Sequence, residues 1–208
     1  ENPNQWSDFI ANRGDLFVAN QFFVDILESN NDPRLEYYFY EIEAGGFVGS
    51  DITDPEISPN SSTINTDSYF ASSRNYPLVT ESELYFLIAE AKERLGQDAS
   101  DDLNAAIEAS VDYVTDGAED GSSIAVYTDV TATQENILTE KWKALFGQIE
   151  PYNDYRRTGI PALVPRPEAA GAARSYIPKR FPLVQEERLY NPNITPVGLD
   201  VPVWWAQP

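Results

Sequence analysis

Carboxylates are the main side chains of this sequence that could do chemistry, because 34 of its 208 residues are Asp or Glu and none is His or Cys. Glu150 and Asp154 lie four residues apart in a predicted helix, so their side chains share one face. A glycoside hydrolase needs two carboxyl groups roughly 5 to 10 Å apart, but so many acids produce such pairs by chance. We therefore favour the interpretation that Asp154 caps a helix or pairs with a cation, and keep a carboxylate-dependent hydrolase as the alternative. The cations in reach are Arg156, Arg157 and Lys179.

The rest of the composition argues against several other classes of function. Without imidazole or thiol groups the chain cannot form a His-dependent triad or the usual zinc sites. A net charge of −20 opposes binding to nucleic acid and docking on an anionic membrane surface. The hydrophobic fraction of 42% predicts a folded globular chain. No apolar run approaches the roughly 18 residues that a membrane-spanning helix needs.

One acidic loop is a candidate metal site. Asp116, Glu119 and Asp120 alternate with glycines in a pattern that superficially resembles an oxygen-rich calcium loop. The segment lacks the regular ligand positions and the distal Glu of a calcium-binding hand. We favour a solvated turn, with a structural calcium ion as the alternative, and we predict no other cofactor or metal.

Exposed aromatic residues are the candidates for binding a sugar, because a flat ring can stack on the C–H groups of a pyranose. The chain has 4 Trp, 12 Tyr and 10 Phe, enough to fill a core and leave some at the surface. We select the aromatics that lie on predicted loops and their polar neighbours, with ordinary packing as the alternative for each. These residues are Trp6, Tyr69, Phe70 and Tyr76, together with Asp67, Arg74 and Asn75.

The pair Arg156 and Arg157 is interpreted as structural. Both lie at the end of a predicted helix, where cations are favoured, and Asp154 lies nearby. We expect a buried bidentate clamp between arginine and carboxylate that holds the Pro-rich C-terminal tail. A site for an anionic ligand is the alternative.

The segment 131–159 must position these groups. Thr131 is a predicted N-cap, and Leu138, Trp142 and Leu145 follow at helical spacing with one apolar face. After a break, a second short helix over 151–158 is predicted to end at Gly159.

The remaining segments predict further helices, one β-hairpin, a surface loop and an extended tail. We expect helices over 17–29, 80–95 and 101–116, a β-hairpin over 35–48, and a surface loop over 49–74. Leu84, Leu87, Ala91 and Leu95 form the predicted buried stripe of the second of these helices. Prolines beyond 160 predict an extended tail that wraps the surface, held down by aromatic and leucine side chains. These are Tyr176, Phe181, Leu183, Tyr190 and Trp204.

Four segments in order resemble the SusD/RagB family, in its SusD-like lipoprotein branch. They read NDPRLEYYF from 31, YPLVTESELYFLIAEAKERLG from 76, KWKALFGQIEPYNDYRRTGIP from 141 and IPKRFPLVQEERLYNPN from 177. The closing PVWW at 202 is similar too. The resemblance implies a mainly α fold of tetratricopeptide-like helical hairpins, to which the residues add the small hairpin and the extended tail.

The same resemblance implies a function and a place. It predicts a non-catalytic, glycan-binding lipoprotein on the extracellular face of the outer membrane of Bacteroidetes, working with a SusC-like TonB-dependent transporter. Residues 1–208 are expected to be the C-terminal portion of such a domain, with the N-terminal repeat half and the lipidated Cys outside this chain. A helical-repeat module for protein interaction, with no ligand of its own, is a further alternative.

Overall fold

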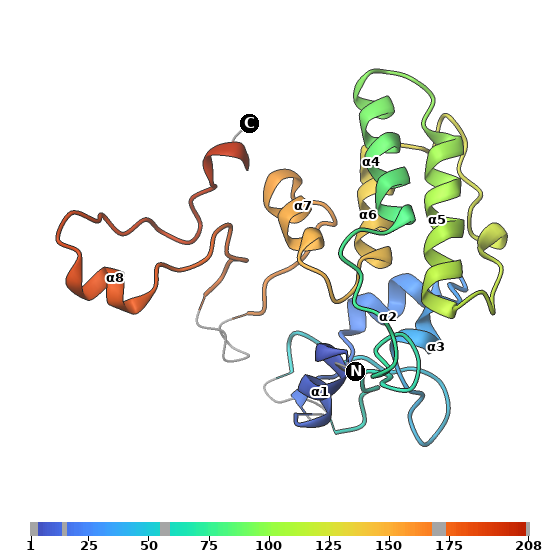
Figure 1. Ribbon diagram of the computed structural model, residues 1–208, viewed down its shortest axis with the longest axis horizontal. Coiled ribbons are helices and arrows are strands. Elements are labelled where there is room, and N and C mark those ends of the chain that lie inside the picture. The colour runs from blue at the N-terminus through green and yellow to red at the C-terminus, as the bar shows by residue number, and fades with distance from the viewer. Residues whose placement is uncertain (1–3, 14–15, 55–58, 168–173, 207–208) are drawn as a thin grey trace.

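The computed structural model describes residues 4–13, 16–54, 59–167 and 174–206, and the chain in these ranges is mainly helical (Figure 1). Pairing of extended segments in the same ranges is limited to isolated bridges such as Val18 with Thr63. The helices, in chain order, are α1 (Gln5–Ala11), α2 (Gln21–Glu28), α3 (Arg34–Tyr38), α4 (Glu81–Arg94), α5 (Ser100–Thr115), η2 (Gly121–Ser123), α6 (Gln134–Ala144), α7 (Glu150–Thr158), α8 (Gln185–Tyr190) and η4 (Trp204–Ala206). No helix in the described ranges is long and apolar enough to cross a membrane.

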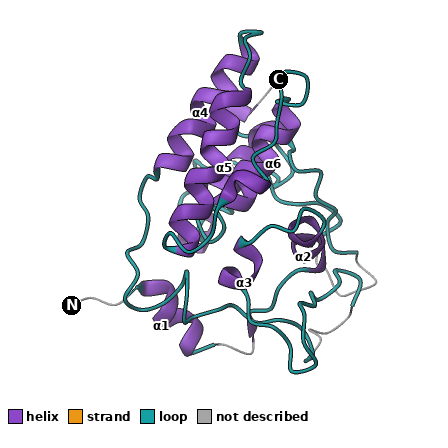
Figure 2. Ribbon diagram, turned by 90° about the vertical axis from the view of Figure 1, so that its right-hand side faces the viewer, coloured by secondary structure: helices purple, strands orange, loops and turns teal. Residues whose placement is uncertain are grey.

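Helices α4, α5 and α6 lie side by side and form the upper part of the molecule, above α1, α2 and α3 (Figures 1 and 2). The Thr80 hydroxyl accepts a hydrogen bond from the Glu83 amide and caps the start of α4, the helix predicted over 80–95. On α5, which lies within the helix predicted over 101–116 apart from its first residue, Leu103 and Ile107 are fully buried. These side chains pack with Phe86 of α4 and with Ile137 of α6.

The predicted buried stripe of α4 is wrong. Leu84, Leu87 and Leu95 are 54%, 47% and 73% exposed, and Ala91 is exposed too. The helix instead buries a face that carries Phe86, Ala89 and Glu90 against its neighbours. In the described part of the chain, no element covers the face of α4 that carries Leu84, Leu87 and Leu95.

Helices α6 and α7 follow the prediction closely, with one correction at the start. Thr133, not Thr131, caps α6, because its hydroxyl accepts from the Asn136 amide; Thr131 instead closes a turn with Thr128. Gly159 ends α7 in the left-handed conformation at φ 75°.

The predicted hairpin over 35–48 is not confirmed, because α3 occupies its first half. Asp32 accepts a hydrogen bond from the Arg34 amide and Pro33 fixes the backbone just before, so the chain turns into a helix there. A turn through Gly45 and Gly46 does form, with the Ile42 amide donating to the Gly46 carbonyl.

The C-terminal tail does not wrap the surface as predicted. It runs from α7 out to α8 and returns to η4, away from the stacked helices (Figure 1). Tyr190 and Trp204 are 80% and 83% exposed and do not hold the tail down, whereas Phe181, although 63% exposed, packs against Tyr152 of α7 at a centroid distance of 5.5 Å. The Arg180 side chain closes the base of the tail by donating to the carbonyls of Val201 and Pro202.

Candidate functional site

An open pocket of about 680 Å³ lies where α1, α2 and α6 meet the first part of the tail. Its volume is in the range typical of sites for small ligands. Aromatic side chains dominate the lining, and we call it the aromatic pocket. It is lined by Trp6, Phe17, Val18, Asn20, Gln21, Phe22, Phe23, Asp25, Phe39, Asp51, Ile52, Ile64, Phe70, Trp142, Phe146, Gly147, Ala162, Leu163, Val164 and Ile177.

Packed rings form one wall of the aromatic pocket. Trp142 of α6 meets Phe22 and Phe23 of α2 at centroid distances of 6.0 and 4.8 Å. Phe146 lies 4.9 Å from Phe23 and continues this wall. Phe22 is 42% exposed, so its ring is available for contact with a ligand.

The polar groups of the pocket come from two short segments, 20–25 and 51–52. The Gln21 amide donates to Asp25 at 2.6 Å and its oxygen accepts from the Gly49 amide, which joins the two segments. Asp51 accepts from the amide and hydroxyl of Thr53, and these hydrogen bonds lower the pKa of Asp51 below its usual value. Both carboxyl groups are exposed and can accept hydrogen bonds from a ligand.

A buried ion network on the other side of α6 holds this helix in place. It consists of Asp32, Arg34, Glu140 and Lys143, all with side chains at most 4% exposed. Arg34 lies 2.6 Å from Asp32 and 3.4 Å from Glu140, and Lys143 lies 2.6 Å from Glu140 and 3.5 Å from Asp32. The network therefore ties α6 to the segment that begins α3.

The network favours the charged forms of Asp32 and Arg34. Burial alone would raise the pKa of Asp32, but the charge and hydrogen bonds of Arg34 and the charge of Lys143 lower it below its usual value. Tyr127 donates to Glu140 at 2.9 Å, and burial beside that carboxylate raises the pKa of the phenol. Arg34 also donates to the Ser110 hydroxyl on α5.

The aromatic residues selected from the sequence lie close together, but with different exposure. Trp6 and Phe70 line the aromatic pocket, and the Trp6 indole donates to the Gly147 carbonyl at 3.0 Å. Tyr69 and Phe70 are only 5% and 3% exposed and belong to the core, while Tyr76 is 44% exposed. Trp6 and Tyr76 therefore offer more surface to a ligand than the other two.

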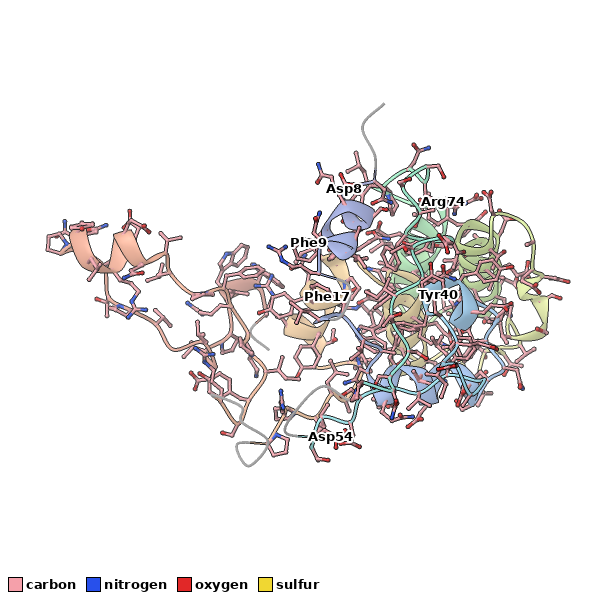
Figure 3. All side chains as sticks on the ribbon, turned by 90° about the horizontal axis from the view of Figure 1, so that it is seen from below. Asp8, Phe9, Phe17, Tyr40, Asp54 and Arg74 are labelled. Atoms are coloured by element: carbon pink, nitrogen blue, oxygen red, sulfur yellow. The ribbon has the colours of Figure 1, made fainter. Side chains whose placement is uncertain are left out.

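The polar neighbours selected with them do not line the aromatic pocket. Asp67 accepts from the Tyr40 hydroxyl at 2.7 Å, and Arg74 pairs with Asp116 at 2.6 Å. The Asn75 carbonyl accepts from Tyr113. In Figure 3, Arg74 and Tyr40 are on the side of α4 and α5, while Phe17 and Asp54 are nearer to the tail.

The two arginines of the predicted clamp have separate contacts. Arg157 makes a bidentate pair with Glu90 of α4 at 2.5 and 2.6 Å and also contacts Asp154, so it joins α7 to α4 and not to the tail. Asp154 pairs in addition with Lys141 of α6. Arg156 does meet the tail, by stacking 5.6 Å from the Phe181 ring and 4.9 Å from the Trp205 ring.

The acidic loop shows no built metal site. Asp120 accepts from the amide and hydroxyl of Ser122 and starts η2, and Asp116 pairs with Arg74. In the described ranges no group of three or more Asp or Glu side chains could hold a metal ion.

Sequence reasoning missed Phe22, Trp142, Asp25 and Asp51 as pocket residues. Phe22 of α2 and Trp142 of α6 each lie among apolar residues at helical spacing, which indicates packing and does not show that the surface between the two helices stays open. Asp51 lies in a loop whose contact with α2 depends on a close approach: a Cβ at Gly49 would lie 2.2 Å from the Gln21 backbone nitrogen. Such a long-range approach has no local sequence signal.

The chain is helical and carries an open pocket lined by aromatic side chains, and comparison with known proteins identifies its family. Residues 1–183 match the SusD-like family described as "Starch-binding associating with outer membrane", and the chain belongs to this family. A search of curated proteins gave no match.

Solved structures show the same fold. The chain is similar to a chitin-binding SusD homolog from Flavobacterium johnsoniae, with a TM-score of 0.71 and 23% identity over 91% of this chain and 49% of that one. A Bacteroidetes SusD-like protein gives 0.67 and 17% over 91% and 53%, and a chitin-binding protein gives 0.53 and 24% over 81% and 43%. This chain thus spans about half the length of the solved relatives it matches.

Proposed function

We propose that the protein captures an extracellular oligosaccharide in the aromatic pocket without transforming it. The observation that carries this proposal is the open pocket in which Phe22 presents a 42% exposed ring beside Trp142. A ring of this kind stacks on the apolar face of a pyranose. Asp25 and Asp51 at the same pocket would accept hydrogen bonds from sugar hydroxyls.

Family membership supports the wider role. We propose that the glycan is delivered to a SusC-like TonB-dependent transporter, and that the protein is held on the extracellular face of the outer membrane through an upstream lipidated Cys. The family description names starch and the outer membrane, and two similar structures are called chitin-binding. Oligomers of N-acetylglucosamine and of glucose are therefore the first ligands to test.

The contacts of Glu150 and Asp154, the pair on which the hydrolase alternative depends, support binding without catalysis. Asp154 pairs with Lys141 and Arg157, and Glu150 accepts from the side-chain amide of Asn153. Asp154 thus joins α7 to α6 and Glu150 is hydrogen-bonded within α7, which favours a structural role over the hydrolase alternative.

Calorimetric titration with chitotetraose and maltotetraose tests the proposal. We expect saturable binding and no released product, with affinity reduced about tenfold in Phe22→Ala because a lost stacking contact costs about 1 to 1.5 kcal/mol. Tyr190→Ala, an 80% exposed aromatic on α8, is the matched control and should bind as the parent does. Unchanged affinity in Phe22→Ala, or products of hydrolysis, would contradict the proposal.

The exposed stripe of α4 favours a second candidate, a helical-repeat module that binds other helices. A single helical hairpin does not bury both its faces and normally stacks on neighbours. This also supports the proposal that residues 1–208 are the C-terminal portion of a longer SusD-like domain. Association with a purified SusC-like transporter in the absence of any glycan binding would favour this candidate over the first.

A further inference from the structure

The charged residues of the aromatic pocket have one sign. Asp25 and Asp51 are the charged side chains among its described lining residues, and no Lys or Arg lines it in the described part of the chain. The segments outside the described ranges, 1–3, 14–15, 55–58, 168–173 and 207–208, also contain no Lys or Arg in their sequences. A surplus of 20 negative charges over the whole chain acts in the same direction.

Both carboxylates are held in place beside the aromatic wall. Gln21 donates to Asp25 at 2.6 Å, and Thr53 donates twice to Asp51, at 2.7 and 2.6 Å. Asp25 lies one helical turn after Phe22 on α2, so its carboxyl group and the exposed ring are on the same side of the helix. A sugar stacked on Phe22 would therefore lie close to a fixed negative charge.

The cations near these segments are engaged elsewhere. Arg166 donates to the Asp54 carbonyl at 2.6 Å, and Arg13 stacks over the Phe9 ring at 4.5 Å. Neither residue lines the aromatic pocket. An anionic group on a ligand would meet Asp25 and Asp51 without a compensating partner from the described lining, and like charges at close range repel.

We infer that Asp25 and Asp51 make the aromatic pocket selective for uncharged glycans and exclude glycans that carry uronate or sulfate groups. This inference rests on the proposed function of the pocket as a glycan site. The two aspartates favour neutral ligands, because they accept hydrogen bonds from hydroxyl or amide donors. They disfavour anionic ligands, because like charges repel.

Competing glycans of matched size test the inference. Chitotetraose and maltotetraose are the neutral probes, and a hyaluronan tetrasaccharide and sulfated maltotetraose are the anionic ones. At about 0.01 M salt, where the Debye length is roughly 30 Å, we expect anionic probes to bind at least about tenfold more weakly than the better neutral probe. At about 0.5 M salt screening should narrow this difference.

Two double variants separate the effect of the pocket carboxylates from the effect of the net charge of the protein. Asp25→Asn/Asp51→Asn should raise the affinity for anionic probes and bring it closer to that of the neutral probes. Asp101→Asn/Glu108→Gln makes the same change of net charge at exposed positions on α5 and should leave the preference as it is.

The outcomes distinguish a failure of the proposed function from a failure of the selectivity alone. If neither neutral probe binds the parent protein, the proposed function fails and the selectivity fails with it. If a neutral probe binds but the anionic probes bind equally well, or if the α5 control relaxes the preference as much as the pocket variant, only the selectivity is contradicted.

Discussion

Helix α6 has two sides with opposite chemistry, and the difference between them explains how the molecule can hold an open pocket. On one side Glu140 and Lys143 are buried in the ion network with Asp32 and Arg34. On the other side Trp142 meets the aromatic pocket. Burying a charge costs free energy, so a buried charge must be fully paired. An aromatic ring, by contrast, can remain partly exposed to solvent at a small cost in free energy.

The buried ion network on one side of α6 therefore fixes the position of the aromatic pocket wall on the other side. A buried ion pair adds little net stability compared with apolar packing, but its geometry is strict because every charge needs its partner. The network connects α6 to α3 and, through Ser110, to α5. Trp142 lies between two members of the network in the sequence, so its backbone position is set by them.

The largest expected effect comes from breaking the closed side. Arg34→Leu leaves Asp32 buried beside only one cation, Lys143, and should lower the free energy of unfolding by about 3 to 5 kcal/mol. Urea denaturation measures this loss.

The control is an arginine at the surface. Arg94 pairs with Glu90 but its side chain is 53% exposed, so Arg94→Leu should change stability by less than about 1 kcal/mol. Equal effects of the two substitutions would contradict the structural role of the network.

A smaller loss is expected where the open side meets the loop after α6. Gly147 has φ 83°, and a Cβ there would lie 2.8 Å from the Phe70 ring. Gly147→Ala should cost about 2 to 3 kcal/mol, of which about 1 to 2 arises from the left-handed backbone. Gly96→Ala, at φ 67° with no atom within 4 Å of the added Cβ, should show the backbone part alone in thermal unfolding. If both variants lose the same stability, the close contact with Phe70 is not significant.

Local sequence signals predicted where helices begin and end better than they predicted which helix faces are buried. The ends of α4 and α7 follow from Thr80 and Gly159, whose capping chemistry is written in a few neighbouring residues. The α4 stripe was misjudged because periodicity shows that a face is apolar but not whether a neighbour covers it.

The ion network could not be predicted for a different reason. Its members come from segments about 106 residues apart in the case of Arg34 and Glu140. Charged residues on a helix usually face solvent, so Glu140 and Lys143 gave no sign of burial. Of the candidate site, Trp6 and Phe70 were selected from the sequence, while Trp142 was assigned only to the apolar face of a predicted helix.

The network should contribute to the pH dependence of the free energy of unfolding. Because the pKa of Asp32 is lower in the folded chain, the unfolded chain binds more protons at acid pH, and stability falls as the pH drops through about 4 and below. Urea denaturation at several pH values between about 3 and 7 measures this. A flat profile below pH 4 would contradict a charged Asp32 in the native state.

Glu83 is expected to act with the opposite sign. Burial raises its pKa in the folded chain, so its stabilising contribution is present at low pH and is lost as the pH rises through the folded value. One of its carboxyl oxygens is buried without a hydrogen-bond partner among the described residues. Glu83→Gln should therefore stabilise the protein at pH 7 and do so less at pH 4; a loss of stability at pH 7 would be contrary evidence.

The smallest effect is expected on the uncovered face of α4. Leu84→Glu and Leu95→Glu place charges at positions that are 54% and 73% exposed, so each should change stability by less than about 0.5 kcal/mol. Phe86→Ala on the buried face of the same helix is the matched control and should cost about 3 to 5 kcal/mol. A large loss in the leucine variants would mean that this face is covered in the chain itself.

The central claim is that α6 holds Trp142 as part of the wall of a passive glycan site. Fluorine NMR of protein labelled with 5-fluorotryptophan gives one signal for each of Trp6, Trp142, Trp204 and Trp205. On titration with chitotetraose or maltotetraose we predict that the signals of Trp142 and Trp6 shift together to saturation, while that of the 83% exposed Trp204 stays in place. A saturable shift confined to Trp204 and Trp205, with Trp142 unchanged, would contradict the account.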